Sequence, residues 1–271
     1  MLVHVIADYG PGDLAFAEVA QHIKLCLPDA ELLYTPVPPF ATLAAGFCVA
    51  QLGLNPAPPN TIIYHNVAPR KDEEEARAEN VGERLAFARL PNGVRAIGVN
   101  AGHAFSFVRD VAEALRLVSV PAGGSQFRSR DLFPKAAGDI VAGSAEALGG
   151  EIPPADIPDV PQNRIAYADG YGNLKTTIEA KMDEVQSGAA VRVRIGEVEL
   201  EATTSDASFE VEEGRLSFAP GSSGWKEANS EEVRWMELFL RGVSAWEAFD
   251  NPPCGASVEV ARPYCSNAGH R

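Results

Sequence analysis

The sequence predicts a fold of the α/β class, with an N-terminal, mostly parallel sheet covered by helices and a C-terminal all-β domain. The first 150 residues alternate strand-like runs with segments whose apolar residues recur at helical spacing. Residues 151–162 then contain four prolines and read as a linker. Beyond them, short apolar runs are separated by Gly, Asp and Ser, which is typical of an all-β domain. We therefore expect domains at 1–150 and 163–271, joined by the Pro-rich linker 151–162.

The N-terminal domain begins with a βα unit, a strand at 3–7 followed by a helix at 14–27. Further strands are predicted at 31–34, 61–65 and 94–99, and further helices at 43–52 and 132–148. The acidic run 72–79 is predicted to lie in a helix that reaches Arg89 and to form its solvated face.

The C-terminal domain is predicted to consist of short strands with one ambiguous segment. The strands are expected at 165–167, 174–178, 190–195, 198–203, 208–211 and 216–218, with a closing strand at 257–261. Apolar residues in 231–249 fit a helix and a buried strand equally well.

Composition favours a small-molecule ligand. The chain has 271 residues, 46% of them hydrophobic, and a formal net charge of -14. Such an acidic chain is a poor partner for nucleic acid, whose phosphates are neutralised by Lys and Arg. The four cysteines lack C-x-x-C spacing, so no zinc site or disulfide framework is indicated and a cytoplasmic location is expected. Since no apolar run approaches about 18 residues, we expect no membrane span.

The segment Asp169-Gly170-Tyr171-Gly172-Asn173 places a carboxylate, an aromatic ring and an amide between two strand-like runs. Asp169 can pair with a ligand cation, Tyr171 can stack on a planar ring, and Asn173 can donate and accept hydrogen bonds. An ordinary β-turn rich in Asp, Gly and Asn explains the same residues. Both interpretations are open at this level.

A second polar segment, 7–13, follows the first strand at the sheet edge where α/β proteins bind ligands. Asp8 is placed to bind ribose hydroxyls, whereas Asp13 either caps the next helix or contacts the ligand. Only Gly10 and Gly12 of a dinucleotide fingerprint are present, which disfavours a Rossmann cofactor.

A third segment, Phe127 to Ala137, leads into a helix. Arg130 and Asp131 suit an ion pair at the helix start, and Arg128 suits a fixed positive charge facing a ligand anion. The histidines have no metal-ligand spacing, and no G-x-S-x-G elbow is present. We therefore expect no metal.

Taken in order, these segments resemble the S-adenosylmethionine hydroxide adenosyltransferase family, which also contains the fluorinase and chlorinase. The resemblance spans nearly the whole chain. Its motifs are matched at Asp8-Tyr9-Gly10 with Asp13, Val37-Pro38-Pro39-Phe40, Phe127 to Ala137, Asp169 to Ile178, and Glu237 to Gly242.

The resemblance implies a β-barrel-like C-terminal domain and a homotrimer with adenosyl sites at subunit interfaces. It implies S-adenosylmethionine as a substrate and no separate cofactor. The ligand-binding residues that it implies are Asp8 for the ribose, Phe40 beside the sugar, Tyr171 and Asn173 for adenine, Asp169 for the methionine ammonium, and Ser222 for the methionine carboxylate.

The chain departs from the family at the residues of the hydrolytic branch. Ala68 stands where that branch has a carboxylate, and Arg128 stands where it has a histidine. Arg77 lies near the position of the hydrolytic arginine, and Arg70 and Arg128 join it as contacts for an anion. Neither Ala68 nor Arg128 can act as a base, so no catalytic residue is assigned.

We therefore expect a protein that binds S-adenosylmethionine or a related adenosyl nucleoside. One interpretation is an enzyme that displaces methionine at C5′ with water or hydroxide. The alternative is a catalytically silent nucleoside-binding or regulatory protein, and a third is an enzyme whose remodelled pocket uses Arg70, Arg128 and Arg130 for an anionic substrate.

Overall fold

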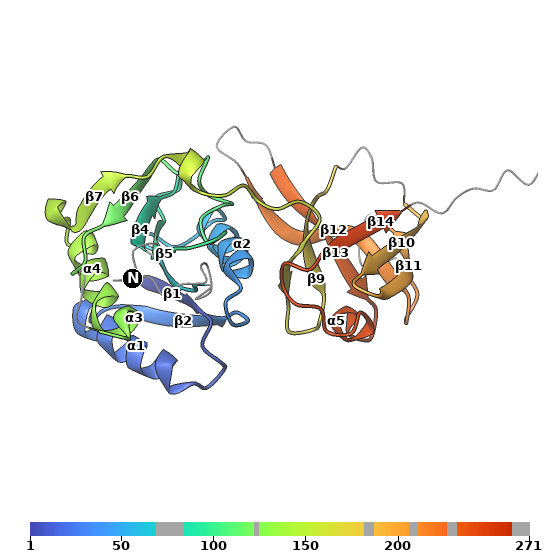
Figure 1. Ribbon diagram of the computed structural model, residues 1–271, viewed down its shortest axis with the longest axis horizontal. Helices are drawn as coiled ribbons and strands as arrows, with labels where there is room; N and C mark the ends of the chain where they lie inside the picture. The colour runs from blue at the N-terminus through green and yellow to red at the C-terminus, as the bar shows by residue number, and fades with distance from the viewer. Residues whose placement is uncertain (69–83, 122–124, 182–186, 206–210, 227–231, 262–271) are drawn as a thin grey trace, which may run out of the picture. The chain divides into compact units, whose positions relative to one another are not determined.

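Strand β1 (Leu2–Ala7) lies near one edge of a seven-stranded sheet with the order β2-β1-β3-β5-β4-β6-β7 (Figure 1). The computed structural model describes residues 1–68, 84–121, 125–181, 187–205, 211–226 and 232–261. The chain divides into two compact units, 1–160 with 225–231, and 161–224 with 232–271.

The first sheet is parallel on one side and antiparallel on the other. Strands β2 (Glu31–Pro36), β1, β3 (Ile62–Asn66) and β5 (Arg95–Asn100) run parallel to one another. Strands β4 (Arg84–Arg89), β6 (Ala114–Val118) and β7 (Leu148–Glu151) continue the sheet with antiparallel pairing. The expected parallel arrangement thus holds for the half of the sheet that contains β1.

Helices cover this sheet. Helices α1 (Leu14–Cys26), α3 (Arg128–Asp131) and α4 (Phe133–Val141) contact one another, and apolar side chains of α1 and α4 join a core with Val3, Val5 and Tyr64. Helix α2 (Thr42–Gly53) contacts β1, β3 and β5 and lies apart from the other three helices (Figure 1). Ten of its residues are buried, which explains why it is apolar on all sides.

Two of the predicted helices were assigned wrong boundaries. Residues 84–89 form strand β4, in which four apolar residues are buried between β5 and β6, so no helix reaches Arg89. Residues 72–79 lie outside the described part of the chain. The helix expected at 132–148 ends at Val141, shortly before Gly143 at φ 80°, and Leu148 already begins β7. The expected linker holds a short 3-10 helix at Pro154–Asp156.

The second unit is built on another seven-stranded sheet, with the order β14-β10-β11-β12-β13-β9-β8. Its strands are β8 (Ile165–Ala168), β9 (Leu174–Glu179), β10 (Ala190–Ile195), β11 (Val198–Thr204), β12 (Leu216–Lys226), β13 (Glu232–Leu240) and β14 (Val258–Ala261). The ambiguous segment is thus a strand, followed by a one-turn helix, α5 (Ala245–Ala248). Only Val211 of the strand expected at 208–211 is described, and it lies in no strand.

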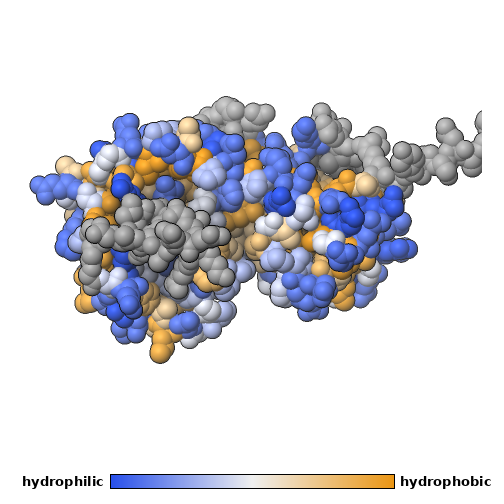
Figure 2. All heavy atoms as spheres, in the orientation of Figure 1, coloured by the Kyte–Doolittle hydropathy of each residue, from blue (hydrophilic) through white to orange (hydrophobic). Residues whose placement is uncertain are grey.

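The protein is therefore a mixed α/β fold on two large sheets. Figure 2 shows polar side chains over much of the visible surface, with hydrophobic ones among them. Among the helices of the described residues, none is both long and apolar enough to cross a membrane. The same residues contain no group of three or more His, Cys, Asp or Glu side chains that could hold a metal ion.

Candidate functional site

In the first unit, polar residues gather at the carboxyl ends of the parallel strands. Ala7 of β1 is in register with Asn66 of β3, and His65 is in register with Gly98 of β5. Asp8, Asn66 and Asn100 therefore occupy the same edge of the sheet, as expected for ligand-binding residues of an open α/β sheet.

Asp8 is directly bonded to the loop that carries Phe40. The Phe40 amide donates to Asp8 Oδ2 at 3.1 Å, across 32 residues of sequence. Phe40 has a φ of 63°, in the left-handed region where residues other than Gly are uncommon. The residue is 45% exposed. The structure thus places two residues predicted for the sugar side by side.

Beneath Asp8 lies a hydrogen-bonded cluster that the sequence did not reveal. Tyr9 Oη and Ser129 Oγ are 2.7 Å apart, and the Asn66 amide donates to Tyr9 Oη at 3.1 Å. The Tyr64 hydroxyl donates to the Ser129 carbonyl. Burial raises the pKa of Tyr64 well above its usual value, so this phenol stays neutral. The one available signal was the position of Tyr9 and Asn66 at strand ends.

Asp13 and Arg130 have structural roles. Asp13 Oδ1 accepts from the Ala15 amide at 2.8 Å and caps α1. Arg130 pairs with Asp131 at 2.6 Å and with Glu18 at 2.9 Å. Hydrogen bonds from Arg130 and Ser125 lower the pKa of Asp131 to about 2. The ion pair expected at this helix start is therefore present, and Arg130 is not a free anion contact.

Arg128 differs from Arg130. Its guanidinium lies 5.5 Å from the centre of the Phe133 ring, and Nη2 donates to the Pro121 carbonyl at 3.4 Å. Among the described residues, no carboxylate lies within ion-pair distance of Arg128, and its buried Nε has no hydrogen-bond partner. Because β5 and β6 both pair antiparallel with β4, Pro121 follows β6 at the edge that contains Asp8.

Arg70 and Arg77 lie outside the described residues. Ala68 is partly buried and packs against the apolar core of the first unit.

In the second unit, the segment 169–173 is a turn that Asp169 organises. Asp169 Oδ1 accepts from the amides of Tyr171 at 2.9 Å and Asn173 at 3.1 Å, and Oδ2 accepts from Asn173 Nδ2 at 2.9 Å. Gly172, at φ 81°, lies against Ser244. The β-turn interpretation of this segment is therefore confirmed.

A cross-strand ion pair adjoins the turn. Lys175 of β9 is in register with Glu237 of β13, and its Nζ lies 3.0 Å from Glu237 Oε2 and 3.5 Å from Asp169 Oδ2. Burial alone would raise the pKa of Asp169, but hydrogen bonds from Asn173 and Tyr171, together with the Lys175 charge, hold it below its usual value. Asp169 thus stays ionised at neutral pH.

The predicted residues around this turn differ in accessibility. The Tyr171 side chain is 85% exposed, whereas Asn173 is buried. Ser222, in β12, is exposed, while its neighbour Ser223 is buried. Ser222 follows Gly221, at which a Cβ would lie 2.4 Å from Glu237 Oε2. Ser222 is thus next in sequence to a residue that touches the ion pair.

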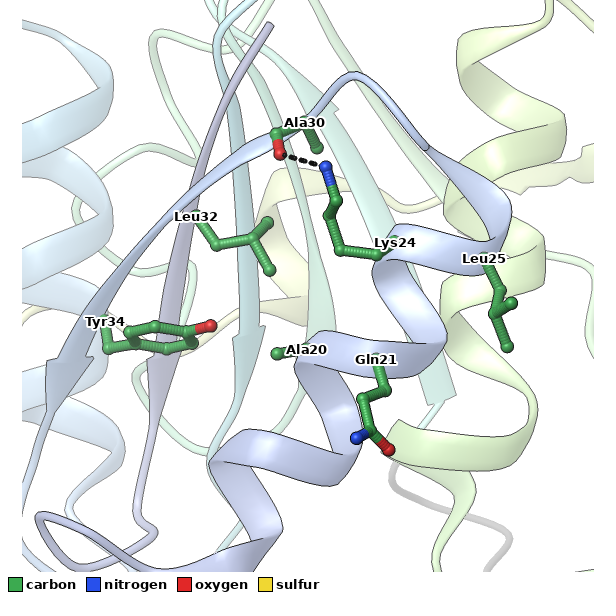
Figure 3. A pocket seen from close by; sticks show the side chains of 7 residues that line it. All are labelled: Ala20, Gln21, Lys24, Leu25, Ala30, Leu32 and Tyr34. Carbon is green, nitrogen blue, oxygen red and sulfur yellow. Dashed lines mark hydrogen bonds between the residues drawn. The ribbon is translucent and has the colours of Figure 1, made fainter.

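An open pocket elsewhere in the first unit contains none of the predicted residues. It lies between α1 and β2, measures about 710 Å³, and is lined mainly by apolar side chains such as Leu25, Leu32 and Tyr34 (Figure 3). The Lys24 ammonium beside it donates to the carbonyls of Pro28 and Ala30.

Comparisons with known proteins establish the fold alone. No family model and no curated protein matches the chain. An uncharacterized conserved protein from Thermotoga maritima has a similar structure, with a TM-score of 0.74 and 19% identity, covering 96% of this chain and 100% of that one. A conserved hypothetical protein from Thermus thermophilus gives a TM-score of 0.66 and 19% identity, covering 95% of this chain and 98% of that one. These likenesses extend along nearly the entire chain.

Proposed function

We propose that the protein binds an adenosyl nucleoside, either S-adenosylmethionine or a relative of it. The contact between Asp8 and Phe40 carries the proposal. Asp8 Oδ2 accepts a hydrogen bond from the Phe40 amide, and Oδ1 accepts none from the described residues. A carboxylate oxygen is a strong acceptor for ribose hydroxyls, and the exposed Phe40 ring offers an apolar face for the sugar.

The turn at 169–173 supports the same ligand class. An exposed tyrosine ring on a hydrogen-bonded turn suits stacking on a flat base. Asn173 Nδ2 is committed to Asp169, which leaves its Oδ1 as an acceptor for the adenine amino group. We therefore assign Tyr171 and Asn173 to adenine, and Ser222 to a polar group of the 5′ substituent.

The proposal extends to assembly and reaction. As the family resemblance implies, the protein is a homotrimer with adenosyl sites at subunit interfaces and a barrel-like C-terminal domain, and as its cysteine pattern suggests, it is cytoplasmic. With S-adenosylmethionine as the ligand, the proposed reaction is a displacement in which a water oxygen attacks C5′, the C5′–S bond breaks, methionine leaves as a thioether, and the water proton passes to solvent. The chain contributes binding and orientation, and Arg128 presents its charge to an anionic group.

A catalytically silent nucleoside-binding protein is the second candidate. It is favoured by Ala68, which packs on the core, and by Arg128, because a guanidinium stays protonated and cannot activate water. Chromatography after long incubation with S-adenosylmethionine separates the two candidates. Adenosine and methionine accumulate if the protein is an enzyme, and the ligand remains intact if it is silent.

Asp8→Ala is expected to weaken adenosine binding about 10- to 100-fold, because a hydrogen bond to a charged group contributes about 1.5–3 kcal/mol. Calorimetry with adenosine and S-adenosylmethionine measures the effect. Asp13→Ala is the matched control: it removes the cap of α1, which costs about 1 kcal/mol of stability, and leaves affinity unchanged. If wild-type protein binds neither nucleoside, the proposed function is wrong.

A further inference from the structure

Lys175 lies beside Asp169, the residue that the family resemblance assigns to a ligand ammonium, with 3.5 Å between Lys175 Nζ and Asp169 Oδ2. A carboxylate offers about four lone-pair sites. Asp169 Oδ1 accepts two backbone amides, and Oδ2 accepts the Asn173 amide and lies 3.5 Å from Lys175 Nζ. The acceptor capacity of Asp169 is therefore already used within the protein.

Lys175 is also held firmly in place. Its side chain is 12% exposed and that of Glu237 is 8% exposed, and the two are direct cross-strand neighbours. Charges so shielded from water attract each other more strongly than surface pairs do. Because Lys175 stays bound to Glu237 at 3.0 Å, a ligand cation at Asp169 would lie beside a buried like charge, which is unfavourable.

We infer that Lys175 is a specificity-determining residue, which makes this site select adenosyl nucleosides whose 5′ substituent carries no free ammonium group. The inference rests on the proposed function and narrows it: it favours adenosyl ligands other than S-adenosylmethionine, whose methionine carries an ammonium, and so weighs against the displacement of methionine. Tyr171 and Asn173 bind the base, while Asp169 shapes the turn and neutralises Lys175 together with Glu237. A ligand ammonium beside Asp169 meets the Lys175 charge and is repelled.

Two matched ligands test this selectivity. They are S-adenosylhomocysteine and its deamino analogue, which lacks only the ammonium, so that stacking, ribose contacts and the carboxylate are the same in both. Calorimetry on the full-length protein is expected to show the deamino analogue binding at least about 10-fold more tightly.

Two variants then assign the preference to Lys175. The double variant Lys175→Met/Glu237→Gln keeps the summed charge of residues 169, 175 and 237. It avoids leaving two buried carboxylates unpaired, and it removes the Lys175 charge from beside Asp169. It is expected to shift the affinity ratio at least about 10-fold toward the ligand with the ammonium. Lys175→Arg keeps the charge and should keep the wild-type ratio, and melting temperatures of both variants report any purely structural loss.

The outcomes separate the two proposals. If wild-type protein binds S-adenosylhomocysteine as tightly as the deamino analogue, or if the double variant leaves the ratio unchanged, Lys175 does not set specificity while nucleoside binding stands. If adenosine and both thioether ligands fail to bind the wild-type protein, the proposed function falls, and this inference falls with it.

Discussion

Gly172→Ala is expected to lower the free energy of unfolding of the second unit by about 2–4 kcal/mol and to abolish nucleoside binding. A Cβ on Gly172 would lie 2.0 Å from Ser244 Oγ and 2.8 Å from Ser244 Cβ. The backbone there has a φ of 81°, which costs an alanine about 1–2 kcal/mol. Moving Ser244 aside also breaks the hydrogen bond that the Glu247 amide donates to Ser244 Oγ, a helix cap worth about 1 kcal/mol.

Gly170→Ala is the matched control, two residues away in the same turn. Nothing lies within 4 Å of a Cβ built on Gly170, so we expect its stability and affinity to stay near wild type. Thermal unfolding and adenosine titration of both variants measure the difference. Equal behaviour of the two variants would mean that the contact between Gly172 and Ser244 does not hold the turn.

Acid is expected to destabilise the first unit through His65. This side chain is fully buried and packs 4.9 Å from the Phe105 ring, and neither ring nitrogen has a hydrogen-bond partner among the described residues. Burial lowers its pKa from 6.5 to about 3. Because the unfolded chain binds this proton more readily, stability that is complete above pH 6.5 falls by about 1.4 kcal/mol per pH unit, reaching a loss of about 5 kcal/mol near pH 3.

His65→Leu isolates this contribution. Urea unfolding at intervals between pH 7 and pH 4 should show a shallower loss of stability in the variant than in the wild type. At pH 7 the change is expected to be small, because an apolar side chain replaces a polar one that has no partner among the described residues. Parallel pH profiles of the two proteins would show that another group accounts for the acid sensitivity.

The spacing of apolar residues predicted the fold correctly where it clearly matched a strand or a helix, as in the opening βα unit and α2. The prediction failed at β4, because its Arg and Ala residues follow an acidic run and this composition is typical of a helix. Pairing with β5 and β6 makes the segment a strand. Segment 231–249 could not be assigned locally, because pairing of β13 with β9 determines its conformation.

The candidate site was predictable only where polar residues follow strands. Asp8 and Phe40 could be named separately, but their hydrogen bond depends on the pairing of β1 with β2. The Tyr9–Ser129 contact joins residues 120 positions apart, and the Lys175–Glu237 pair joins residues 62 positions apart. Local spacing contains no information on either contact.

The left-handed backbone of Phe40, in the loop after β2, is tied to the carboxylate of Asp8. The left-handed conformation costs about 1–2 kcal/mol, and the charge-assisted hydrogen bond from the Phe40 amide to Asp8 returns about 1.5–3 kcal/mol. The bond to Asp8 thus offsets the backbone cost, and the Thr42 amide, which donates to the Phe40 carbonyl at 2.9 Å, helps to hold the same conformation. A ligand hydroxyl that fixes the position of Asp8 therefore also fixes Phe40. By thermodynamic reciprocity, a loop that is already ordered binds that ligand with higher affinity.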